Sequence, residues 1–302
     1  MSPASLTFLD ENTIRPLLLL EDLIPAMEKT LIDFSAGRVT QPVRSIVNIA
    51  EHRGFMGLMP AVYGDVMGTK LVNFYPENGA TGLPTHQAVI VLFQAATGEP
   101  LAVMDGRLIT ELRTAAVSAV ATKLLAPANA SSLAILGSGV QARAHVRALS
   151  LVRRFEDVRV WSRNTGNAEA LAEEIGARAC TAEEAVRDAD VVVTVTSATE
   201  PILPGAWLKP GALVNAVGAV GPTRREVDSD TMRGAVVVDS REAAAKESGD
   251  ILMAGARVYA ELGELLNGTK PLPQAEVTVF KSLGIAVEDL AAAKLVLQRM
   301  KA

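Results

Sequence analysis

The residues with the clearest chemical implication form the segment Gly137-Ser138-Gly139-Val140-Gln141-Ala142. This GxGxxA spacing is typical of a turn that carries the backbone close to a pyrophosphate. The first glycine allows the tight turn, the second permits the close approach, and the alanine lets the following helix pack on its strand. The N-terminus of that helix offers N–H groups and a partial positive charge. The motif predicts a dinucleotide-binding turn.

The segments on both sides of this turn support the same interpretation. The apolar run Leu133–Leu136 precedes it, a helical pattern follows, and a second apolar run covers Val158–Trp161. Strand, glycine turn, helix and strand in this order is the context in which a dinucleotide-binding fingerprint is found. The alternative, a tight turn in another kind of α/β domain, is less compatible with a matching pattern on both sides.

The residues after the second strand bear on which dinucleotide is bound. Ser162, Arg163 and Asn164 stand where NAD-dependent enzymes usually carry an acidic residue for the ribose 2′-hydroxyl. No carboxylate there would repel a 2′-phosphate, and Arg163 can pair with such a phosphate or stack on adenine. We therefore expect NADP(H) as the preferred cofactor, with NAD(H) possible. The alternative for Arg163 is a solvated arginine at the end of a strand.

The remaining chain predicts two domains. From Ser131 onward strands and helices alternate, and strands such as VVVTVT and AVVVD are continuous apolar runs. This pattern predicts a doubly wound parallel sheet covered on both faces. The segment 42–104 instead alternates turns with five strand-like runs: Arg44–Ile49, Phe55–Met59, Thr69–Tyr75, Gln87–Phe93 and Leu101–Met104. We expect an α/β protein with a Rossmann domain over 115–284 and a discontinuous α+β domain, with an antiparallel sheet, over 1–114 and about 285–302.

Helical patterns accompany both domains. Asp10 can cap a short first helix, and Glu21–Ser35 reads as an amphipathic helix. Thr110–Ala126 is predicted as a helix capped by Thr110, which places Arg113 in a first turn where the helix dipole favours an anion. The tail, Ile285–Met300, is expected to form a helix that returns to the first domain.

The strands of 42–104 also suggest a partner. Several of them are apolar on both faces, so we expect both faces of their sheet to be buried. A second subunit would be a natural cover for one face, and a homodimer is therefore predicted.

Composition excludes several classes of protein. The 302 residues include 34 acidic and 29 basic side chains, a net charge of −5, which argues against nucleic-acid binding. The single cysteine, Cys180, excludes an intrachain disulfide, gives no zinc cluster and is compatible with a reducing compartment. Neither a signal-peptide pattern nor an apolar stretch of membrane-spanning length is found. We expect a cytoplasmic protein with no metal site, nucleic-acid partner or membrane partner.

Several stretches together are similar to one family: PVRSIV, LMPA with TKLVNFY, MDGRLITELRTAAVSAVATK, ILGSGVQA, ATEPIL, NAVGA, and KESGDIL with FKSLG. The chain resembles the ornithine cyclodeaminase/mu-crystallin family, and within it the mu-crystallin, or ketimine reductase, branch. The matches spread from residue 42 to residue 288. The resemblance implies a Rossmann domain and a second domain that binds substrate and joins a partner subunit through its sheet.

The resemblance also implies catalytic residues. Arg44 would grip the substrate carboxylate, for which the guanidinium fork is suited. Lys70, in a largely apolar strand, resembles the family's active-site lysine, and desolvation could lower its pKa so that it donates a proton or polarises a C=N bond. Arg113 would bind the carboxylate or the cofactor phosphates. Without the resemblance, a surface ion pair for Arg44 and a snorkelling side chain for Lys70 would be preferred.

Cofactor contacts are expected at further positions. Thr85 and His86 resemble a cofactor-contacting turn, although His86 could otherwise be an ordinary hydrogen-bonded histidine. No chemistry is assigned to His145 on the fingerprint helix. The complete set of expected cofactor contacts is Thr85, His86, Arg113, Thr114, Gly137, Ser138, Gly139, Val140, Gln141, Ser162, Arg163, Asn164, Thr196, Val217 and Leu283.

Two positions depart from the cyclodeaminase pattern. Cyclodeaminases and related alanine dehydrogenases carry an acidic residue just after the NAVG-type strand, where this chain has Val220. Cyclodeaminases also carry a glutamate directly before LMP, where this chain has Gly57. Amine oxidation, deamination and ring closure need such carboxylates. Imine reduction requires only an anchored substrate carboxylate and a hydride presented to the C=N carbon.

The expected function is therefore NAD(P)H-dependent reduction of cyclic ketimine carboxylates. Candidate substrates are 1-pyrroline-2-carboxylate and 1-piperideine-2-carboxylate, which would give L-proline and L-pipecolate. Two alternatives stay open. One is an ornithine cyclodeaminase or alanine-type amino-acid dehydrogenase, and the other is a thyroid-hormone-binding or crystallin-like binding protein.

Overall fold

The computed structural model describes residues 6–300. Residues 1–5 and 301–302, which the domain prediction includes, lie outside the described residues. The chain divides into two compact units, one made of Met1–Arg113 with Ile285–Ala302 and the other of Thr114–Gly284. Each unit contains one sheet, a parallel sheet in the second and a mixed sheet in the first. The predicted α/β fold class is confirmed.

The sheet of the first unit is a meander with two added edge strands. Its strands are β1 (Thr7–Leu9), β2 (Val39–Thr40), β3 (Ser45–Ile49), β4 (Gly54–Tyr63), β5 (Val66–Phe74), β6 (His86–Gln94) and β7 (Pro100–Asp105). They are ordered β1-β7-β6-β5-β4-β2, and β3 also pairs with β4. Neighbours from β3 to β7 are antiparallel, as predicted. The prediction of a wholly antiparallel sheet is wrong at β1, which pairs in parallel with β7 and is too short to show a sequence period.

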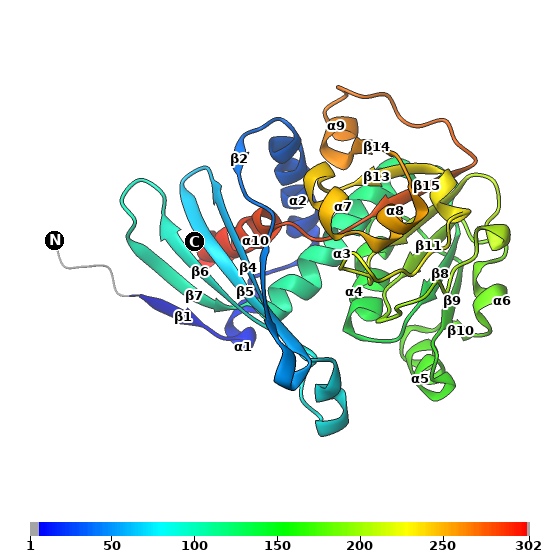
Figure 1. Cartoon of the computed structure of the whole chain (residues 1–302), viewed down its shortest axis with the longest axis horizontal. Helices are drawn as coiled ribbons and strands as arrows, with labels where there is room; N and C mark the ends of the chain where they lie inside the picture. Colours follow the sequence, from blue (N-terminus) through cyan, green and yellow to red (C-terminus); the bar gives the residue numbers. More distant parts are fainter. Residues whose placement is uncertain (1–5, 301–302) are drawn as a thin grey trace. The chain divides into compact units, whose positions relative to one another are not determined.

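One face of this sheet is covered by helices of the same unit. These are α1 (Glu11–Ile14), α2 (Leu20–Ser35) and α10 (Ala286–Met300). Figure 1 shows α10, in red, against the cyan strands β4 and β5 and beside the blue helix α2, although it ends the chain. Short 3-10 turns at Ala50–His52 and Pro76–Thr81 complete the unit. Asp10 caps α1 as predicted, because its carboxylate accepts the Thr13 N–H at 2.9 Å.

The other face of the same sheet is open within one chain. Met59, Ile90 and Met104 are buried on the helix-covered face, while Val62 and Val89 are 39% and 42% exposed on the opposite face. The expectation that both faces are buried is therefore not met inside a single chain. The side chains that predicted it are apolar, but no element of the described chain covers them.

The second unit is a doubly wound parallel sheet. Its strands are β8 (Ser132–Leu136), β9 (Asp157–Trp161), β10 (Arg178–Ala179), β11 (Val191–Thr194), β12 (Ala212–Ala216), β13 (Ala235–Val238), β14 (Val258–Glu261) and β15 (Val277–Lys281). The order is β10-β9-β8-β11-β12-β15-β13-β14, and all neighbours are parallel. The side chains of β8, β11 and β12 are all buried, as their continuous apolar runs predicted.

The helices of this unit are mostly short. They are α4 (Val140–Ser150), α5 (Thr165–Ile175), α6 (Ala182–Val186), α7 (Arg241–Glu247), α8 (Gly249–Ala254) and α9 (Leu262–Leu266), with 3-10 turns at Gly205–Trp207 and Thr231–Arg233. The strands β10, β14 and β15 and the helices α7, α8 and α9 were not predicted from the sequence, because short segments give little periodicity. No helix among residues 6–300 is long and apolar enough to cross a membrane.

The helix that carries Arg113 starts earlier than predicted. It is α3 (Gly106–Leu125), and the Asp105 carboxylate accepts the N–H groups of Arg107 at 3.0 Å and Leu108 at 3.2 Å. Asp105 therefore caps this helix, and the prediction of Thr110 as the cap is wrong. Arg113 consequently lies beyond the first turn, where the helix dipole no longer favours an anion.

Candidate active site

Two of the three predicted catalytic residues meet a pair of carboxylates in the interior of the first unit. Lys70 Nζ lies 2.8 Å from Asp289 Oδ2. Arg113 Nε lies 3.0 Å from Asp289 Oδ1, and Arg113 Nη1 lies 2.6 Å from Glu288 Oε2. All four side chains are at most 5% exposed. Burying charges in this way costs free energy unless they are paired, and each of these four side chains is paired with an opposite charge.

The strand and helix that carry these groups fix their positions. Lys70 lies in the middle of β5, opposite Met59 on one side and Ile90 on the other, so it points to the helix-covered face. Glu288 and Asp289 lie in the first turn of α10, where the helix dipole favours acidic side chains. The start of that helix is fastened by the Val287 N–H, which donates to Gln41 Oε1 at 2.8 Å.

The environment of Lys70 changes its acidity. Burial lowers the pKa of its ammonium to about 8, and the positive charges of Arg113 and Arg44 act in the same direction, while Asp289 opposes them. The ammonium also donates to Thr110 Oγ1 at 3.3 Å. A lysine with a pKa of about 8 can hold a proton at neutral pH and still release it to a substrate.

Arg44 lies at the edge of the same cluster. It directly precedes β3 and is half-buried. Its Nη1 is 3.9 Å from Sδ of Met59, the residue that pairs with Lys70 across the sheet. The structure therefore brings Arg44, Lys70 and Arg113 together within the first unit. Arg113 differs from expectation in one respect, because its guanidinium already serves two carboxylates of α10.

The turn before β6 carries the remaining candidates of this unit. His86 is the first residue of β6 and is exposed, and its ring centroid lies 4.8 Å from that of Phe74. Thr85 is half-buried, and its carbonyl accepts the Tyr75 N–H at 2.9 Å. The packing on Phe74 fixes the histidine ring beside the turn.

The predicted dinucleotide turn has the geometry that its glycines imply. Gly137 follows β8 with φ of +129°, and a Cβ there would lie 2.6 Å from the Val195 carbonyl oxygen. Gly139 is the N-cap of α4, and a Cβ there would meet nothing within 4 Å. The cap supplies no side-chain hydrogen bond to the helix N-terminus. A helix N-terminus entered through glycines without a side-chain cap fits a pyrophosphate. Val140 and Gln141, the next predicted contacts, form its first turn.

The residues after β9 lie beside this turn. The Ser138 hydroxyl donates to the Ser162 hydroxyl at 2.9 Å, which links the ends of β8 and β9. The Asn164 side chain caps α5 by accepting the Asn167 N–H at 3.2 Å. Arg163 is exposed, and within residues 6–300 it forms no ion pair with a carboxylate. Its guanidinium is thus available to a ligand.

The other predicted cofactor contacts follow the carboxyl ends of strands. Thr196 comes two residues after β11, Val217 directly after β12 and Leu283 two residues after β15. Ligands of doubly wound sheets bind outside the carboxyl ends of the strands, which is where these three residues lie, and their contact with a cofactor stays a prediction. Thr114 differs, because it is a buried residue of α3.

The buried carboxylates of both units were not predicted from the sequence. Glu288 and Asp289 are fully buried in the first unit, and Glu226 and Asp239 are fully buried in the second. A signal for the first pair was present, because a Glu-Asp dipeptide interrupts the apolar run AVEDLAAA. Lone acidic residues such as Glu226, among neighbouring charged residues in TRREVD, carry no comparable signal.

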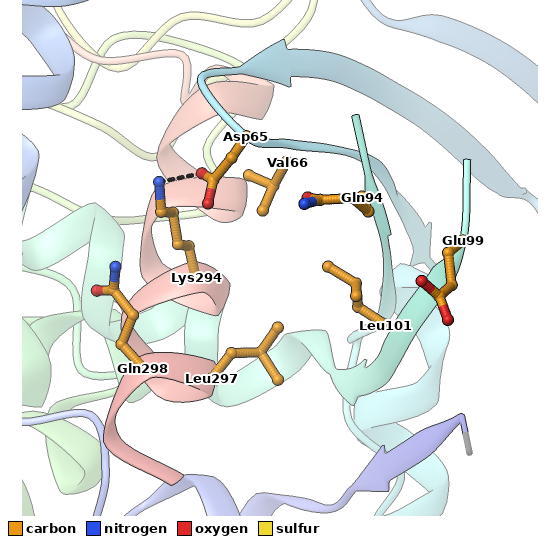
Figure 2. A pocket seen from close by; sticks show the side chains of 8 residues that line it. All are labelled: Asp65, Val66, Gln94, Glu99, Leu101, Lys294, Leu297 and Gln298. Carbon is orange, nitrogen blue, oxygen red and sulfur yellow. Dashed lines mark hydrogen bonds and ion pairs between the residues drawn. The ribbon is translucent and has the colours of Figure 1, made fainter. Parts of the chain in front are cut away.

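A surface pocket of the first unit is separate from this cluster. Figure 2 shows Leu297 of α10 facing Leu101 of the sheet and Lys294 of the same helix paired to Asp65. Gln94 and Gln298 also line the pocket. Its volume of about 200 Å³ lies below the ~300–1,000 Å³ usual for small-molecule sites. None of the predicted catalytic residues lines it.

The sequence model of the ornithine cyclodeaminase/mu-crystallin family matches residues 6–302. The chain belongs to this family. Ketimine reductase mu-crystallin of Mus musculus is 54% identical over 283 residues, which cover 91% of this chain and 90% of that protein. The family match and this relative confirm the resemblance found in the sequence.

Solved structures of two family relatives have the same fold. Thermococcus litoralis Delta(1)-pyrroline-2-carboxylate reductase, in complex with NADH and L-proline, is 36% identical with a TM-score of 0.94 and covers 98% of both chains. An archaeal alanine dehydrogenase dimer with bound NAD is 32% identical with a TM-score of 0.92, covering 98% of this chain and 96% of its own.

Proposed function

We propose that this protein reduces cyclic ketimine carboxylates with NAD(P)H, delivering hydride to the C=N carbon. The observation that carries the proposal is the buried Lys70 ammonium, with a pKa of about 8, in one cluster with Arg44 and Arg113. Family relatives named as a ketimine reductase and a pyrroline-2-carboxylate reductase support this chemistry. The proposed substrates are 1-pyrroline-2-carboxylate and 1-piperideine-2-carboxylate, and the products L-proline and L-pipecolate.

The first unit would bind the substrate. Arg44 would hold the carboxylate through its guanidinium fork, because this group is half-buried and matches carboxylate geometry. Lys70 would keep the imine nitrogen protonated, which makes the adjacent carbon more electrophilic. Asp289 would orient the Lys70 ammonium, and Arg113 would hold Asp289 in place.

The second unit would bind the cofactor. The glycine turn and the N-terminus of α4 fit the pyrophosphate, and Ser162 and Arg163 follow the strand that precedes the adenosine ribose site in such domains. When bound, the reduced nicotinamide supplies the hydride. The protein's own residues need to hold only the substrate carboxylate and one proton.

The structure of β4 also disfavours cyclodeaminase chemistry. A Cβ added at Gly57 would lie 3.1 Å from Cγ1 of Val72 and 3.5 Å from Cδ1 of Ile46. A glutamate at this position would therefore displace its neighbours. With Val220 at the second position, the chain lacks both carboxylates that the deaminating relatives carry.

The test is turnover of purified protein with each ketimine and with ornithine. We expect loss of the reduced-nicotinamide absorbance with a ketimine, from mildly acidic to neutral pH, and no ammonia from ornithine. No loss of absorbance with either ring across that range would overturn the proposal. Ammonia release from ornithine, without ketimine reduction, would favour the cyclodeaminase alternative.

We further propose NADPH as the preferred cofactor, on the ground of the exposed Arg163 and the absence of an acid among Ser162, Arg163 and Asn164. Replacing Arg163 by alanine is expected to raise the KM for NADPH by roughly ten-fold and to leave that for NADH nearly unchanged, since an ion pair to phosphate is lost. Arg187→Ala, at an exposed arginine paired with Glu183 in the same unit, is the control. An unchanged NADPH KM would show that Arg163 does not read the 2′-phosphate.

We infer a homodimer through the open face of the first sheet. Val47, Val62 and Val89 are 48%, 39% and 42% exposed on that face. Large exposed apolar patches mark protein interfaces, and these three side chains would contribute to one. An alanine dehydrogenase of similar fold is described as a dimer, which supports the inference.

A further inference from the structure

A buried carboxylate lies among the carboxyl ends of the central strands of the second unit. Glu226 is fully buried, and its two oxygens accept five hydrogen bonds. Burying an anion is costly unless donors surround it. This one is surrounded almost entirely by groups that belong to two adjacent strand ends.

The donors divide between the two strand ends. Oε1 accepts the Thr196 N–H at 2.6 Å and the Thr196 hydroxyl at 2.7 Å, two residues after β11. Oε2 accepts the Gly218 N–H at 2.6 Å and the Ala219 N–H at 3.1 Å, two and three residues after β12. It also accepts the hydroxyl of Thr194, the last residue of β11, at 2.8 Å. The carboxylate therefore clamps one loop to the other.

The two loops that Glu226 joins lie very close to each other at Gly218. A Cβ at this position would lie 2.3 Å from the Thr196 carbonyl oxygen and 2.6 Å from Glu226 Oε1. No side chain can be accommodated there without moving the backbone. The two loops are therefore in direct backbone contact, with the carboxylate beside that contact.

A second buried pair fixes the same loop from the other side. Lys281 Nζ donates to the Ala219 carbonyl oxygen at 2.6 Å and pairs with Asp250 Oδ2 at 3.0 Å. Asp250 Oδ1 in turn accepts the Glu226 N–H at 2.8 Å. The backbone of Ala219 is thus held at its N–H by Glu226 and at its carbonyl oxygen by Lys281.

The position of these loops in the sheet relates them to one half of the dinucleotide. Strand order is β9-β8-β11-β12, with the pyrophosphate turn after β8 and the adenosine-ribose residues after β9. The half of the dinucleotide that extends away from adenosine therefore lies over the ends of β11 and β12, because ligands bind outside the carboxyl ends of the strands. That half carries the nicotinamide.

We propose that Glu226 is a positioning residue for the nicotinamide half of the cofactor. It does not touch the cofactor itself, but holds Thr196 and the Gly218-Ala219 backbone in the arrangement that receives this half. The inference rests on the proposed function only in requiring that a nicotinamide dinucleotide binds. It does not depend on which imine is reduced.

The test compares a complete dinucleotide with a fragment that lacks nicotinamide. In Glu226→Gln, an amide donor would face backbone N–H groups that now find an acceptor, so the loops would separate. We expect the Kd of NADH, measured by calorimetry, to rise about ten-fold or more. The Kd of ADP-ribose should change less than about two-fold, because the adenosine and pyrophosphate contacts lie after β9 and β8. If wild type binds NADPH more tightly, NADPH and 2′-phospho-ADP-ribose form the equivalent pair.

A milder pair of variants covers the case in which Glu226→Gln does not fold. Thr194 is fully buried, and its hydroxyl donates to Glu226. Thr194→Val removes this donor at nearly constant volume. It should weaken NADH binding more than ADP-ribose binding, by a smaller factor than Glu226→Gln does. Thr194→Ser restores the hydroxyl and should restore NADH binding.

The control is a carboxylate that holds backbone elsewhere in the unit. Asp228 is half-buried and accepts the N–H groups of Gly205 at 3.0 Å and Thr231 at 2.8 Å. Asp228→Asn should lower thermal stability without changing the ratio of the NADH and ADP-ribose affinities. Equal losses for both ligands in the Glu226 or Thr194 variants, or no loss for either, would overturn the inference. If the variants lose NADH affinity but not ADP-ribose affinity, and the wild type does not reduce a ketimine, only the proposed substrate is overturned.

Discussion

At the scale of single residues, the proposed function depends on the competition between burial and charge at Lys70. Burial and two arginines lower the pKa of its ammonium, and Asp289 raises it, with a result of about 8. A fully exposed lysine would titrate near 10.4 and would be a poor proton donor at neutral pH. The cluster therefore places a proton donor in the range where imine chemistry needs one.

The pH dependence of turnover tests this assignment. Lys70 is protonated below its pKa and neutral above it, so kcat/KM for a ketimine should fall as the pH rises through about 8. Lys70→Met should lower kcat by roughly 10²–10⁴-fold, the usual contribution of a general acid. Lys294→Met, at the separate pocket of Figure 2, is the control and should keep nearly full activity. A profile that stays flat through this range would remove Lys70 from the proton transfer.

Asp289 gives a second prediction with a definite sign. Its negative charge favours protonated Lys70, so Asp289→Asn should lower the Lys70 pKa further. The alkaline limb of the kcat/KM profile should then move to lower pH than in wild type, and its displacement can be read from the two profiles. A limb that moves to higher pH would contradict the assigned role of this carboxylate.

The cations and the carboxylates of the cluster were not equally predictable. Lys70 and Arg44 were assigned from family motifs, and both lie in the cluster. Glu288 and Asp289 were missed because Arg113 and Asp289 are 176 residues apart in sequence, and no local pattern predicts a pairing at that distance. The partner of a buried charge is determined by tertiary packing, which spacing along the chain does not encode.

At the scale of elements, long periodic segments were predictable and short or capped ones less so. The meander from β3 to β7 and the parallel sheet followed from alternating and continuous apolar runs. The start of α3 was misplaced because Gly106, a poor helix former, occupies its first position while Asp105 caps it. The hydrogen bonds of Asp105 identify it as the cap. In the sequence, Thr110 is also a residue type that caps helices.

The contact between α3 and α4 predicts a pH dependence of stability. His145 is buried, its Nδ1 lies 2.7 Å from the Gln141 carbonyl and its Nε2 lies 3.0 Å from Ser118 Oγ. Burial lowers the pKa of His145 to about 4, from 6.5. Between these values the unfolded chain binds more protons, so acidification favours unfolding. Protonation of His145 in the unfolded chain should lower the free energy of unfolding by about 2 kcal/mol as the pH falls from about 7 to about 5.

Denaturant unfolding at the two pH values measures this effect. His145→Gln should lose less stability on acidification than wild type, because no imidazole remains to be protonated. His52→Gln, at an exposed histidine of the first unit, should behave as wild type. Equal acid sensitivity of wild type and His145→Gln would contradict the assignment.

At the scale of the whole molecule, the open sheet face predicts association. Exposed apolar side chains are unfavourable in water, and burial of Val47, Val62 and Val89 against a second copy would remove them from solvent. Light scattering should give twice the mass of one chain at micromolar concentration. Val89→Lys, in the centre of the open face, should shift the protein towards monomer, while Leu272→Lys, exposed in the second unit, should not. A wild-type mass of one chain would contradict the inferred dimer.

The central claim is that hydride passes from the reduced nicotinamide to the C=N carbon of a cyclic ketimine carboxylate. The most direct measurement uses NADPH carrying deuterium at the transferred position, with 1-piperideine-2-carboxylate as substrate and mass spectrometry of the product. We expect pipecolate with one deuterium on the carbon that bears the carboxylate. Pipecolate without deuterium, or no pipecolate while the nicotinamide stays reduced, would contradict it.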